Sequence, residues 1–497
     1  MPSKELLQIP RVMIAGTHSG VGKTTIATGI MAALAGLGLP VQGYKVGPDY
    51  IDPSYHTLAT GRSSRNLDLW LLGESLLSTF ARSAQGCWAV IEGVMGLFDG
   101  IAGTQGYGSS ADIAKMLEAP VVLVVDAKNM SRSIAAFVHG YATFDPDLKV
   151  CGVILNRVKS SSQEALLRHA MKEINMPILG VLSTEERIRL PERHLGLVPS
   201  QEKAYHDDYF GELTRVISQS IDLAKLQEIM LAVGAQGEAG AETAPVANRE
   251  RLATGSVGEG NGEKPQEHII NQEIYKEEFN KRELGKEEIE KITIEKNITE
   301  EELSRRAIII PRNQYKVNIL SGEKISIRLG IAWDEAFTFY YQDALDCAES
   351  LGFKLVQFSP LHDTELPRNL HALIIGGGFP ELHLERLNQN QRFMEALRNF
   401  ASTGKTIYAE CGGYMYLGQE ITDFAGRAYS MAGLIPIKSE MTKKLQGMGY
   451  RRGVFTADSF LGKAGMEVHG HEFHYSKVDF QEHGDGEPAS AYNLYKG

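Results

Sequence analysis

Short and nearly continuous apolar runs alternate with longer amphipathic segments between residue 12 and about residue 230. The runs are VMIA, QGYKV, CWAVIEGV, PVVLVVDA, CGVILNRV and MPILGVL. Runs of this kind suit strands that are buried on both faces, and such strands are typical of parallel sheets covered by helices. We therefore predict an α/β domain with a parallel sheet over residues 1–234.

The composition changes between residues 235 and 325, first to Gly, Ala and Glu and then to a Lys/Glu-rich stretch with few aromatic residues. Such a segment buries too little apolar surface to offset the entropy that ordering would cost. We predict a largely mobile linker, with a solvated helix as an option near KEEIEKITIEK. Its simplest role is that of a spacer.

The α/β rhythm restarts after this segment, in SIRLGIAWD, FKLVQFSP, HALIIGGGFPE and TIYAECGGYMYLG. A chain of 497 residues is also too long for one ordinary core. We predict a second α/β domain over residues 326–497.

Charge and hydropathy exclude several classes of protein. A formal net charge of −11 argues against nonspecific binding to nucleic acid or to an anionic membrane. No apolar run approaches the roughly 20 residues that span a bilayer, and the N-terminus lacks a secretory pattern. The four cysteines stand far apart without a CxxC pair, which argues against a disulfide framework or a structural zinc site. We expect a cytoplasmic protein without nucleic-acid or membrane partners.

A glycine-rich loop joins the first apolar run to an amphipathic helix, in the sequence AGTHSGVGKTT. The strict pattern GxxxxGK[ST] would place its first glycine at position 17, which is Thr here, while Gly16 stands one residue earlier. Strand, loop and helix N-terminus are nevertheless the context in which backbone N–H groups hold phosphate. The sequence therefore predicts a variant phosphate-binding loop for ATP.

Each residue type in this loop has an expected task. We expect Lys23 to reach the β- and γ-phosphates and Thr24 to place its hydroxyl on Mg²⁺. Gly20, Gly22 and Thr25 complete the predicted nucleotide-binding set. ATP and Mg²⁺ are thus the predicted co-substrate and cofactor.

Charged residues follow two further apolar runs, in KVGPDYIDPSYH and VIEGVMGLFDG. Carboxyl ends of parallel strands meet at one edge of a sheet, where the phosphate loop also emerges, and a nucleotide-bound metal needs carboxylates there. Taken singly, each acid is more often a turn or cap residue. We predict metal ligands at Asp49 and Glu92 besides Thr24, and substrate or phosphate contacts at Lys45, Asp49, Asp52 and Asp99.

Asn156 ends another run, GVILNRV, at the same predicted edge. Its amide could form hydrogen bonds with the purine base of ATP. A turn-forming asparagine is an equally good interpretation.

Cys411 follows an apolar run and precedes two glycines, which is the arrangement of a sharp strand-to-helix turn that exposes a nucleophile. A lone buried cysteine is the common alternative. A thiol nucleophile needs an imidazole to accept its proton and N–H donors for the oxyanion. We expect these donors at Gly377 and Gly378, in GGGFPE, and at Gly412.

Three histidines stand close together in VHGHEFHYS, at positions 469, 471 and 474. In a strand, His469 and His471 lie on one face and His474 lies on the other, so only one face can point at the thiol. A metal site made of the three histidines is the weaker interpretation, because no cysteine or carboxylate cluster of ligand spacing supports it.

Six motifs in this order resemble those of the cobyrinic acid a,c-diamide synthases: GTHSGVGKTT, KVGPDYIDP, EGVMGLFDG, GGGFPE, AECGGYMYLG and GHEFHYS. The likeness covers both predicted domains. It implies a P-loop NTPase-like domain similar to dethiobiotin synthetase, joined to a class I glutamine amidotransferase-like α/β domain. The implied reaction is ATP-dependent, stepwise amidation of the c and a acetate side chains of a corrin ring in cobalamin synthesis, through acyl phosphates, with ammonia taken from glutamine.

The resemblance also implies roles for residues of the thiol site. Cys411 looks like the thiol that forms a γ-glutamyl thioester, and His474 looks like the histidine that activates it, with His471 as the second choice. The usual third, acidic partner has no clear counterpart, since Glu472 would point away from His471 and this branch is similar to a dyad. The orientation of the imidazole therefore stays open.

Several alternatives remain at this stage. Nickel-sirohydrochlorin is a candidate ring, because enzymes that act on it are similar across the same motifs, and hydrogenobyrinic acid, the metal-free corrin, is another. A cobyric acid synthase fits KVGPDYIDPSYH less well. From other classes, the first domain could be a partitioning-type ATP switch, or glutamine hydrolysis could serve a separate partner. The expected partners are a tetrapyrrole, glutamine and ATP, and a homodimer is a possible assembly.

Overall fold

The computed structural model describes residues 8–183, 206–235, 327–481 and 491–496. All of them belong to one compact unit, which consists of Met1–Ala239 and Ser304–Gly497. The predicted linker and its optional helix lie outside the described residues, apart from the first position of the linker. In the part of the chain that is described, no helix is both long and apolar enough to cross a membrane.

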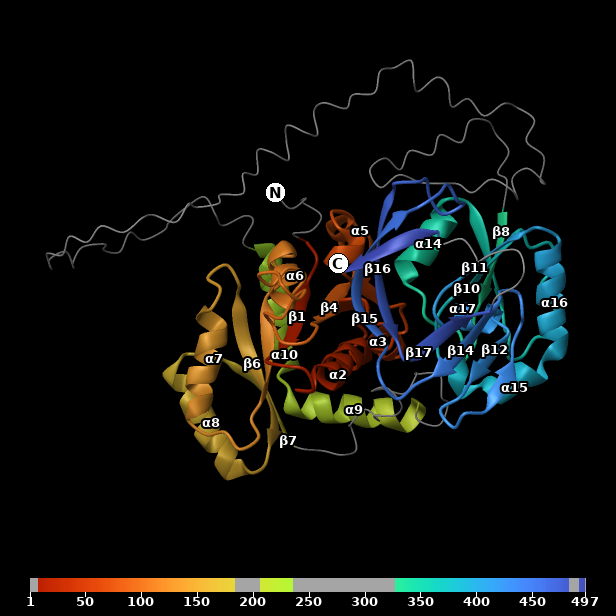
Figure 1. The fold of residues 1–497 in the computed structure, drawn as a ribbon. Helices are drawn as coiled ribbons and strands as arrows, with labels where there is room; N and C mark the ends of the chain where they lie inside the picture. The colour runs from red at the N-terminus through yellow and green to blue at the C-terminus, as the bar shows by residue number, and fades with distance from the viewer. Residues whose placement is uncertain (1–7, 184–205, 236–326, 482–490, 497) are drawn as a thin grey trace, which may run out of the picture. The chain divides into compact units, whose positions relative to one another are not determined.

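The first half contains the predicted parallel sheet (Figure 1). Its strands are β1 (Arg11–Gly16), β2 (Val41–Val46), β3 (Arg65–Leu67), β4 (Trp88–Glu92), β5 (Val121–Asp126), β6 (Val150–Val158) and β7 (Ile178–Ser183). They lie in the order β3-β2-β4-β1-β5-β6-β7, and every neighbouring pair is parallel. Six of the seven strands coincide with the apolar runs of the sequence, and only the three-residue edge strand β3 was missed.

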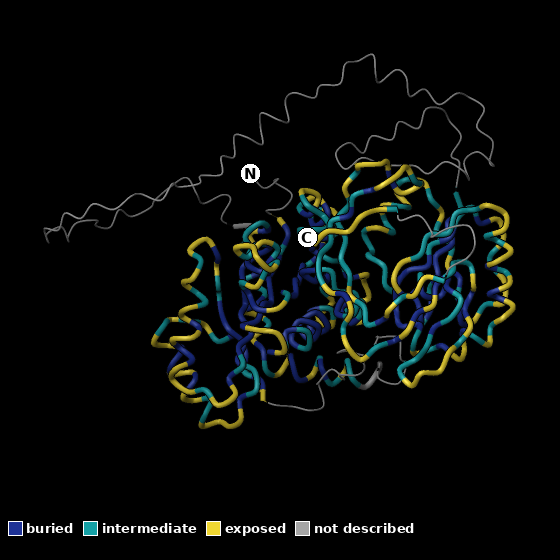
Figure 2. The backbone as a smooth tube through the Cα atoms, viewed as in Figure 1, coloured by how far each residue is buried: buried dark blue, intermediate teal, exposed yellow. Residues whose placement is uncertain are grey.

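Helices cover both faces of this sheet (Figure 1). They are α2 (Lys23–Gly36), α3 (Asp52–Thr60), α4 (Leu69–Leu72), α5 (Ser75–Ser83), α6 (Ser110–Met116), α7 (Ser133–Thr143), α8 (Ser161–Glu173), α9 (His206–Ser220) and α10 (Leu223–Ala235). Along β1, Met13 and Ala15 join the core under α5–α8, while Val12 and Ile14 join the core under α2, α9 and α10. This period of two explains why the strands read as continuous apolar runs, and Figure 2 shows β1 buried throughout.

The second half begins with a smaller parallel sheet in the order β11-β10-β8-β9. Its strands are β8 (Ile327–Ala332), β9 (Phe353–Phe358), β10 (Ala372–Ile375) and β11 (Thr406–Ala409). The helices of this half are α14 (Gln342–Ser350), the 3₁₀ turn η4 (Pro380–Leu382), α15 (Leu384–Gln389), α16 (Gln391–Ser402) and α17 (Gly412–Leu417). The prediction of a second α/β fold is therefore confirmed.

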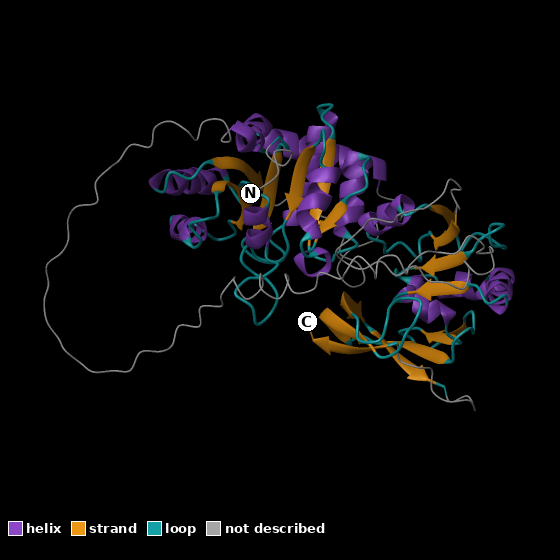
Figure 3. Cartoon of the chain, turned by 90° about the horizontal axis from the view of Figure 1, so that it is seen from above, coloured by secondary structure: helices purple, strands orange, loops and turns teal. Residues whose placement is uncertain are grey.

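Two further sheets follow, which the apolar runs did not reveal (Figure 3). One contains β12 (Glu420–Thr422), β13 (Ala428–Ser430), β14 (Ile437–Met441) and β17 (Ser476–Phe480), and the other contains β15 (Gly447–Phe455), β16 (Glu467–His474) and β18 (Tyr492–Lys496). Most of their pairs are antiparallel. Strands with one solvated face alternate apolar and polar residues, as β14 does in IKSEM, and so lack the continuous runs of the parallel sheets.

Candidate functional site

The phosphate loop lies between β1 and α2, as the sequence predicts. Gly20 and Gly22 both have positive φ angles, 77° and 100°. A Cβ atom on Gly22 would also lie 2.5 Å from Nδ2 of Asn156, so only glycine fits this position without strain. The loop thereby presents its backbone at the N-terminus of α2, where an anion is stabilised.

Lys23 is buried at the first position of α2. Its Nζ donates to the carbonyl oxygens of His18, at 3.2 Å, and Met95, at 2.5 Å. Burial and the neighbouring Lys45 lower the pKa of Lys23 to about 8. A phosphate bound in the loop would pair with this ammonium group and stabilise its positive charge.

A buried cluster of charges lies beside the loop. Nζ of Lys45 lies 2.5 Å from Oδ2 of Asp52 and 2.7 Å from Oε1 of Glu92. Burial alone would lower the pKa of Lys45, but the two carboxylates raise it well above its usual range. The hydroxyl of Thr24 donates to Glu92 at 2.6 Å and contacts Asp52 at 3.3 Å, which joins the cluster to the phosphate loop.

This cluster fits a Mg²⁺ ion that also binds nucleotide phosphates. Oδ1 of Asp52 is buried and has no hydrogen-bond partner, while burial and the nearby Glu92 raise the pKa of Asp52. Among the described residues, no group of three or more His, Cys, Asp or Glu forms a metal cage. Two carboxylates and the Thr24 hydroxyl are the few oxygen ligands that Mg²⁺ usually takes from a protein when phosphates and waters complete its shell.

The two acids of the loop before α3 have different contacts. Oδ1 of Asp49 accepts hydrogen bonds from the backbone N–H groups of Ile51, at 2.7 Å, and Asp52, at 3.2 Å. Among the described residues, this oxygen therefore supports the start of α3 and forms no hydrogen bond or ion pair with Lys45 or Thr24. Asp52 instead faces Thr24. Sequence spacing alone could not separate them, because both belong to the same short loop.

Two other predicted residues support loops. Oδ2 of Asp99 accepts from the N–H of Gly96 at 2.9 Å, and its charge acts on Lys23. Nδ2 of Asn156 donates to the carbonyl of Val21 at 2.8 Å and so holds the phosphate loop. Binding of the purine base by Asn156 stays a prediction.

His56 is a residue of this site that sequence reasoning missed. It is fully buried, and its Nε2 lies 2.7 Å from Oε2 of Glu92, while its Nδ1 lies 3.3 Å from Oγ of Ser64. Burial alone would raise the pKa of Glu92, but Lys45 and His56 hold it well below its usual range. The sequence signal that could have identified His56 is its position as the last residue of the motif KVGPDYIDPSYH.

We predict that His56→Ala lowers the free energy of unfolding by about 3 kcal/mol, because it leaves the Glu92 carboxylate buried with one partner fewer. Since Glu92 has a depressed pKa in the folded state, its pairing stabilises the protein above the unfolded-state pKa and is lost as the pH falls through the folded-state pKa. Urea denaturation at neutral and acidic pH measures both effects. The control is His139→Ala, at an exposed position of α7, and an equal loss in the two variants would contradict the prediction.

Cys411 lies at the sharp turn between β11 and α17. Its φ angle of 48° and ψ angle of −113° are strained for a residue with a side chain, as at a nucleophile elbow. The next helix fits closely, because a Cβ atom on Gly413 would collide with the carbonyl of Ile375. The sequence prediction of a strand–turn–helix around this thiol is confirmed.

Two of the three predicted oxyanion donors face the thiol directly. Although Cys411 is an exposed residue, desolvation by the protein around its thiol and the charge of Glu381 raise its pKa to about 11, and the N–H groups of Gly412 and Gly378 oppose this shift. Gly377 is close as well, since a Cβ atom there would lie 3.2 Å from Cβ of Cys411. N–H groups placed around a reacting sulfur are suited to hold the oxyanion of a thioester-forming step.

All three histidines lie in strand β16 (Glu467–His474), so His474 lies on the opposite face from His469 and His471, as predicted. Nδ1 of His474 lies 2.9 Å from the carbonyl oxygen of Ser476. A carbonyl can only accept, so Nδ1 carries the proton and Nε2 of the neutral ring is the basic atom. This backbone carbonyl orients the imidazole of His474.

Glu472 lies on the same face as His474, since Oε1 of Glu472 and Nε2 of His474 both lie over Gly447. Glu472 forms an ion pair with Arg451. His471 lies on the opposite face, edge-on to Tyr450 at 5.6 Å between ring centroids. Among the described residues neither His471 nor His474 forms a hydrogen bond with Cys411, so the choice of the base stays a prediction.

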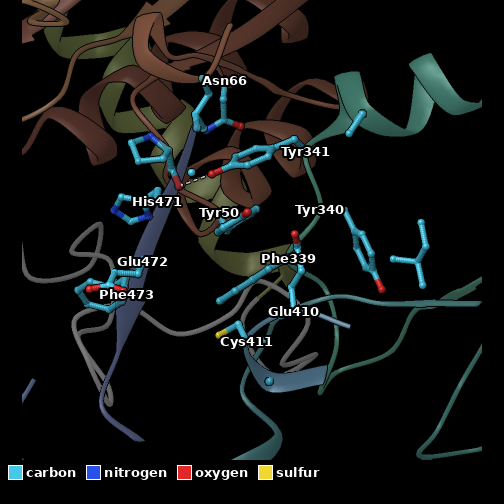
Figure 4. Close-up of a pocket in the computed structure, with 18 of the residues that line it drawn as sticks. Tyr50, Asn66, Phe339, Tyr340, Tyr341, Glu410, Cys411, His471, Glu472 and Phe473 are labelled. Carbon is cyan, nitrogen blue, oxygen red and sulfur yellow. Dashed lines mark hydrogen bonds between the residues drawn. The ribbon is translucent and has the colours of Figure 1, made fainter. Parts of the chain in front are cut away.

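Residues of both halves line one cavity of about 2670 Å³ (Figure 4). Its wall includes Gly20 and Asp49 from the first half and Cys411 and His474 from the second. The predicted phosphate site and the predicted thiol site therefore open into the same space.

Contacts around this cavity tie the two halves together. Arg65 of β3 forms ion pairs with Asp343 and with Asp346, the latter at 2.6 Å, on α14. The ring of His469 stacks on Trp70 at 4.1 Å. Arg65, Asp343, Asp346 and His469 also line the cavity, so these contacts lie at its wall.

Two families of known domains match the chain. Residues 12–198 match the family described as CobQ/CobB/MinD/ParA nucleotide binding domain. Residues 328–496 match the family described as CobB/CobQ-like glutamine amidotransferase domain. Both matches agree with the predicted fold class of each half.

Curated relatives match along nearly the whole chain. A hydrogenobyrinate a,c-diamide synthase of Streptomyces coelicolor is 38% identical over 95% of this chain and 87% of its own. A cobyrinate a,c-diamide synthase of Caldanaerobacter subterraneus subsp. tengcongensis is 37% identical over 94% and 86%. Another cobyrinate a,c-diamide synthase, of Synechocystis sp., is 37% identical over 94% and 82%.

Proposed function

We propose that this chain, which belongs to the family of cobyrinate a,c-diamide synthases, amidates the a and c acetate carboxylates of cobyrinic acid with ATP and glutamine. The observation that carries the proposal is the single cavity onto which the phosphate loop and the Cys411 turn both open. A nucleotide site alone or a glutaminase alone would not need this shared space.

The first half would activate the acceptor. A carboxylate is a poor electrophile, so ATP transfers its γ-phosphoryl group to it and an acyl phosphate forms. Lys23 and Lys45 lie where they can neutralise charge on the phosphoryl group. A bound Mg²⁺ ion, held by Thr24, Asp52 and Glu92, would add further positive charge at the phosphates.

The second half would release ammonia from glutamine. The Cys411 sulfur attacks the carboxamide carbon, the C–N bond breaks, and ammonia leaves as a γ-glutamyl thioester forms. His474 is the proposed base, because its Nε2 is free to take the thiol proton and pass it to the leaving amine. Water then hydrolyses the thioester to glutamate, while ammonia attacks the acyl phosphate and displaces inorganic phosphate.

The identity of the ring is the finer part of the proposal. Relatives at nearly equal identity are named for cobyrinate and for hydrogenobyrinate, so we propose cobyrinic acid first and its metal-free counterpart second. Nickel-sirohydrochlorin stays a third candidate from the sequence motifs. A partitioning-type ATP switch would leave the amidotransferase half without a task. The expected cytoplasmic location and homodimer stay predictions.

The test incubates the purified protein with Mg-ATP, glutamine and one of the three rings, and reads product mass. Two successive replacements of OH by NH₂ on one ring identify the substrate and support diamidation. A parallel series with ammonium salt in place of glutamine separates the two halves. If no ring gains an amide from either nitrogen source, the proposed function is wrong.

A further inference from the structure

The loop between β2 and α3 is anchored in the nucleotide half. Nδ2 of Asn66 donates to the carbonyl oxygens of Gly47, at 2.9 Å, and Asp49, at 2.6 Å. A few residues later, Asp52 reaches Lys45. These contacts therefore fix the backbone of this loop relative to the charged residues of the phosphate site.

Tyr50 leaves this loop toward the other half (Figure 4). Its ring stacks on Phe339, with centroids 4.9 Å apart and planes 4° apart, and on Tyr341, with centroids 4.4 Å apart and planes 23° apart. The hydroxyl of Tyr341 also donates to the carbonyl of Pro48 at 3.0 Å. The loop of the nucleotide half is thus clamped by two aromatic residues of the amidotransferase half.

The segment that carries these two aromatic residues is bonded to the glycine loop beside the thiol. The N–H groups of Thr338 and Phe339 both donate to the carbonyl of Gly377 at 3.1 Å. The N–H of Gly376 donates to the hydroxyl of Tyr340 at 2.8 Å. A Cβ atom on Gly377 would lie 3.3 Å from the Phe339 ring and 3.2 Å from Cβ of Cys411, so the ring and the thiol flank the same glycine.

From this chain of contacts, we propose that Tyr50 is a positioning residue that couples glutamine hydrolysis to the state of the ATP and acceptor site. The inference rests on the proposed function, since it names how the two reactions of that function are kept in step. Among the described residues, Tyr50 forms no hydrogen bond or ring contact with Cys411 or with the phosphate loop, and it acts through Phe339 and the Gly376–Gly378 loop.

Such coupling is effective because oxyanion donors act only when their positions are accurate. Their contribution depends on N–H groups that are held within a few tenths of an ångström of the developing charge. A shift of the Gly47–Asp52 loop on binding of ATP and acceptor would be carried by the stacked ring to Phe339 and to the carbonyl of Gly377. The glycine loop would then hold its donors more favourably when the ammonia can be used.

The experiment measures glutamate released per amide formed, in the presence of Mg-ATP, glutamine and the ring that the wild type amidates. We expect Tyr50→Ala to raise this ratio about tenfold, because two aromatic pairs are lost at once. Amidation from ammonium salt should change by less than about twofold, since that route does not use the thiol site. Tyr50→Phe keeps both stacked rings and should restore the wild-type ratio.

Two further variants separate coupling from damage. Phe339→Ala breaks the same stack from the other half and should raise the ratio to a similar extent, and the double variant should add little, as expected for a shared contact. Tyr429→Ala, which removes a half-buried ring of β13 that does not line the cavity, is the matched control and should leave the ratio unchanged.

Each outcome decides the matter. A wild-type ratio in Tyr50→Ala, or an equal loss of amidation from glutamine and from ammonia, would overturn the coupling role. A rise of the ratio in Tyr429→Ala as large as in Tyr50→Ala would do the same, because it would show a general effect of removing a ring. Failure of the wild type to form amide from either glutamine or ammonia would instead refute the proposed function itself.

Discussion

Cys411→Ser is expected to abolish amidation from glutamine while amidation from ammonium salt continues at nearly the wild-type rate. Without the thiol no γ-glutamyl thioester forms, and loss of a covalent nucleophile costs about 1000-fold or more in kcat. The acyl phosphate site in the first half keeps all of its contacts. Product mass and glutamate release, measured side by side with both nitrogen sources, check this expectation.

A matched control removes a different free thiol. Cys151→Ser, on β6 and outside the shared cavity, should leave both activities intact. If Cys411→Ser still releases glutamate at the wild-type rate, another nucleophile acts on glutamine and our assignment of Cys411 is wrong. Loss of both activities would show that the substitution disturbs more than the thiol site.

Lys23→Met is expected to give the opposite pattern, with loss of amidation from glutamine and from ammonia alike. We expect a decrease of about 100- to 1000-fold in kcat, which is typical when a preorganised charge that stabilises the transition state is removed. Basal glutamine hydrolysis in the absence of ATP should persist, because Lys23 lies in the first half. ATP consumption and glutamate release, measured separately, test this.

The same lysine predicts a pH dependence. Burial and Lys45 lower the pKa of Lys23 to about 8, so its charge is present below pH 8 and is lost as the pH rises through that value. The value of kcat/KM for ATP, which reports groups of the free enzyme, should therefore fall above about pH 8. Lys128→Met, at an exposed position of the same half, is the control and should keep the wild-type profile. A flat profile in the wild type would contradict the role of Lys23.

Local patterns in the sequence were enough to predict the fold class, the phosphate loop and the turn at Cys411. The parallel strands β1, β2 and β4–β11 were found because each is part of a short apolar run, and the run is continuous where a strand is buried on both faces, as β1 is. The phosphate loop and the Cys411 turn depend on adjacent residues, with glycine where the backbone needs positive φ or close approach. Such features involve few residues that are neighbours in the chain, and a linear pattern can therefore reveal them.

Tertiary structure alone decided which side chains meet. Asp52 and not Asp49 faces Thr24, and His56 reaches Glu92, because the fold of β2 and α3 sets the direction of each side chain. The backbone carbonyl of Ser476 orients His474. Every residue has such a carbonyl, so the residue types in the sequence cannot identify this partner.

The contact between Tyr50 and Phe339 shows the same limit most clearly. It joins residues almost three hundred positions apart, across a segment whose composition says nothing about which faces it brings together. What the sequence by itself determined is the chemistry that each half can perform, since that follows from short motifs. How the two reactions are joined depends on the packing of one half against the other, which only the tertiary structure decides.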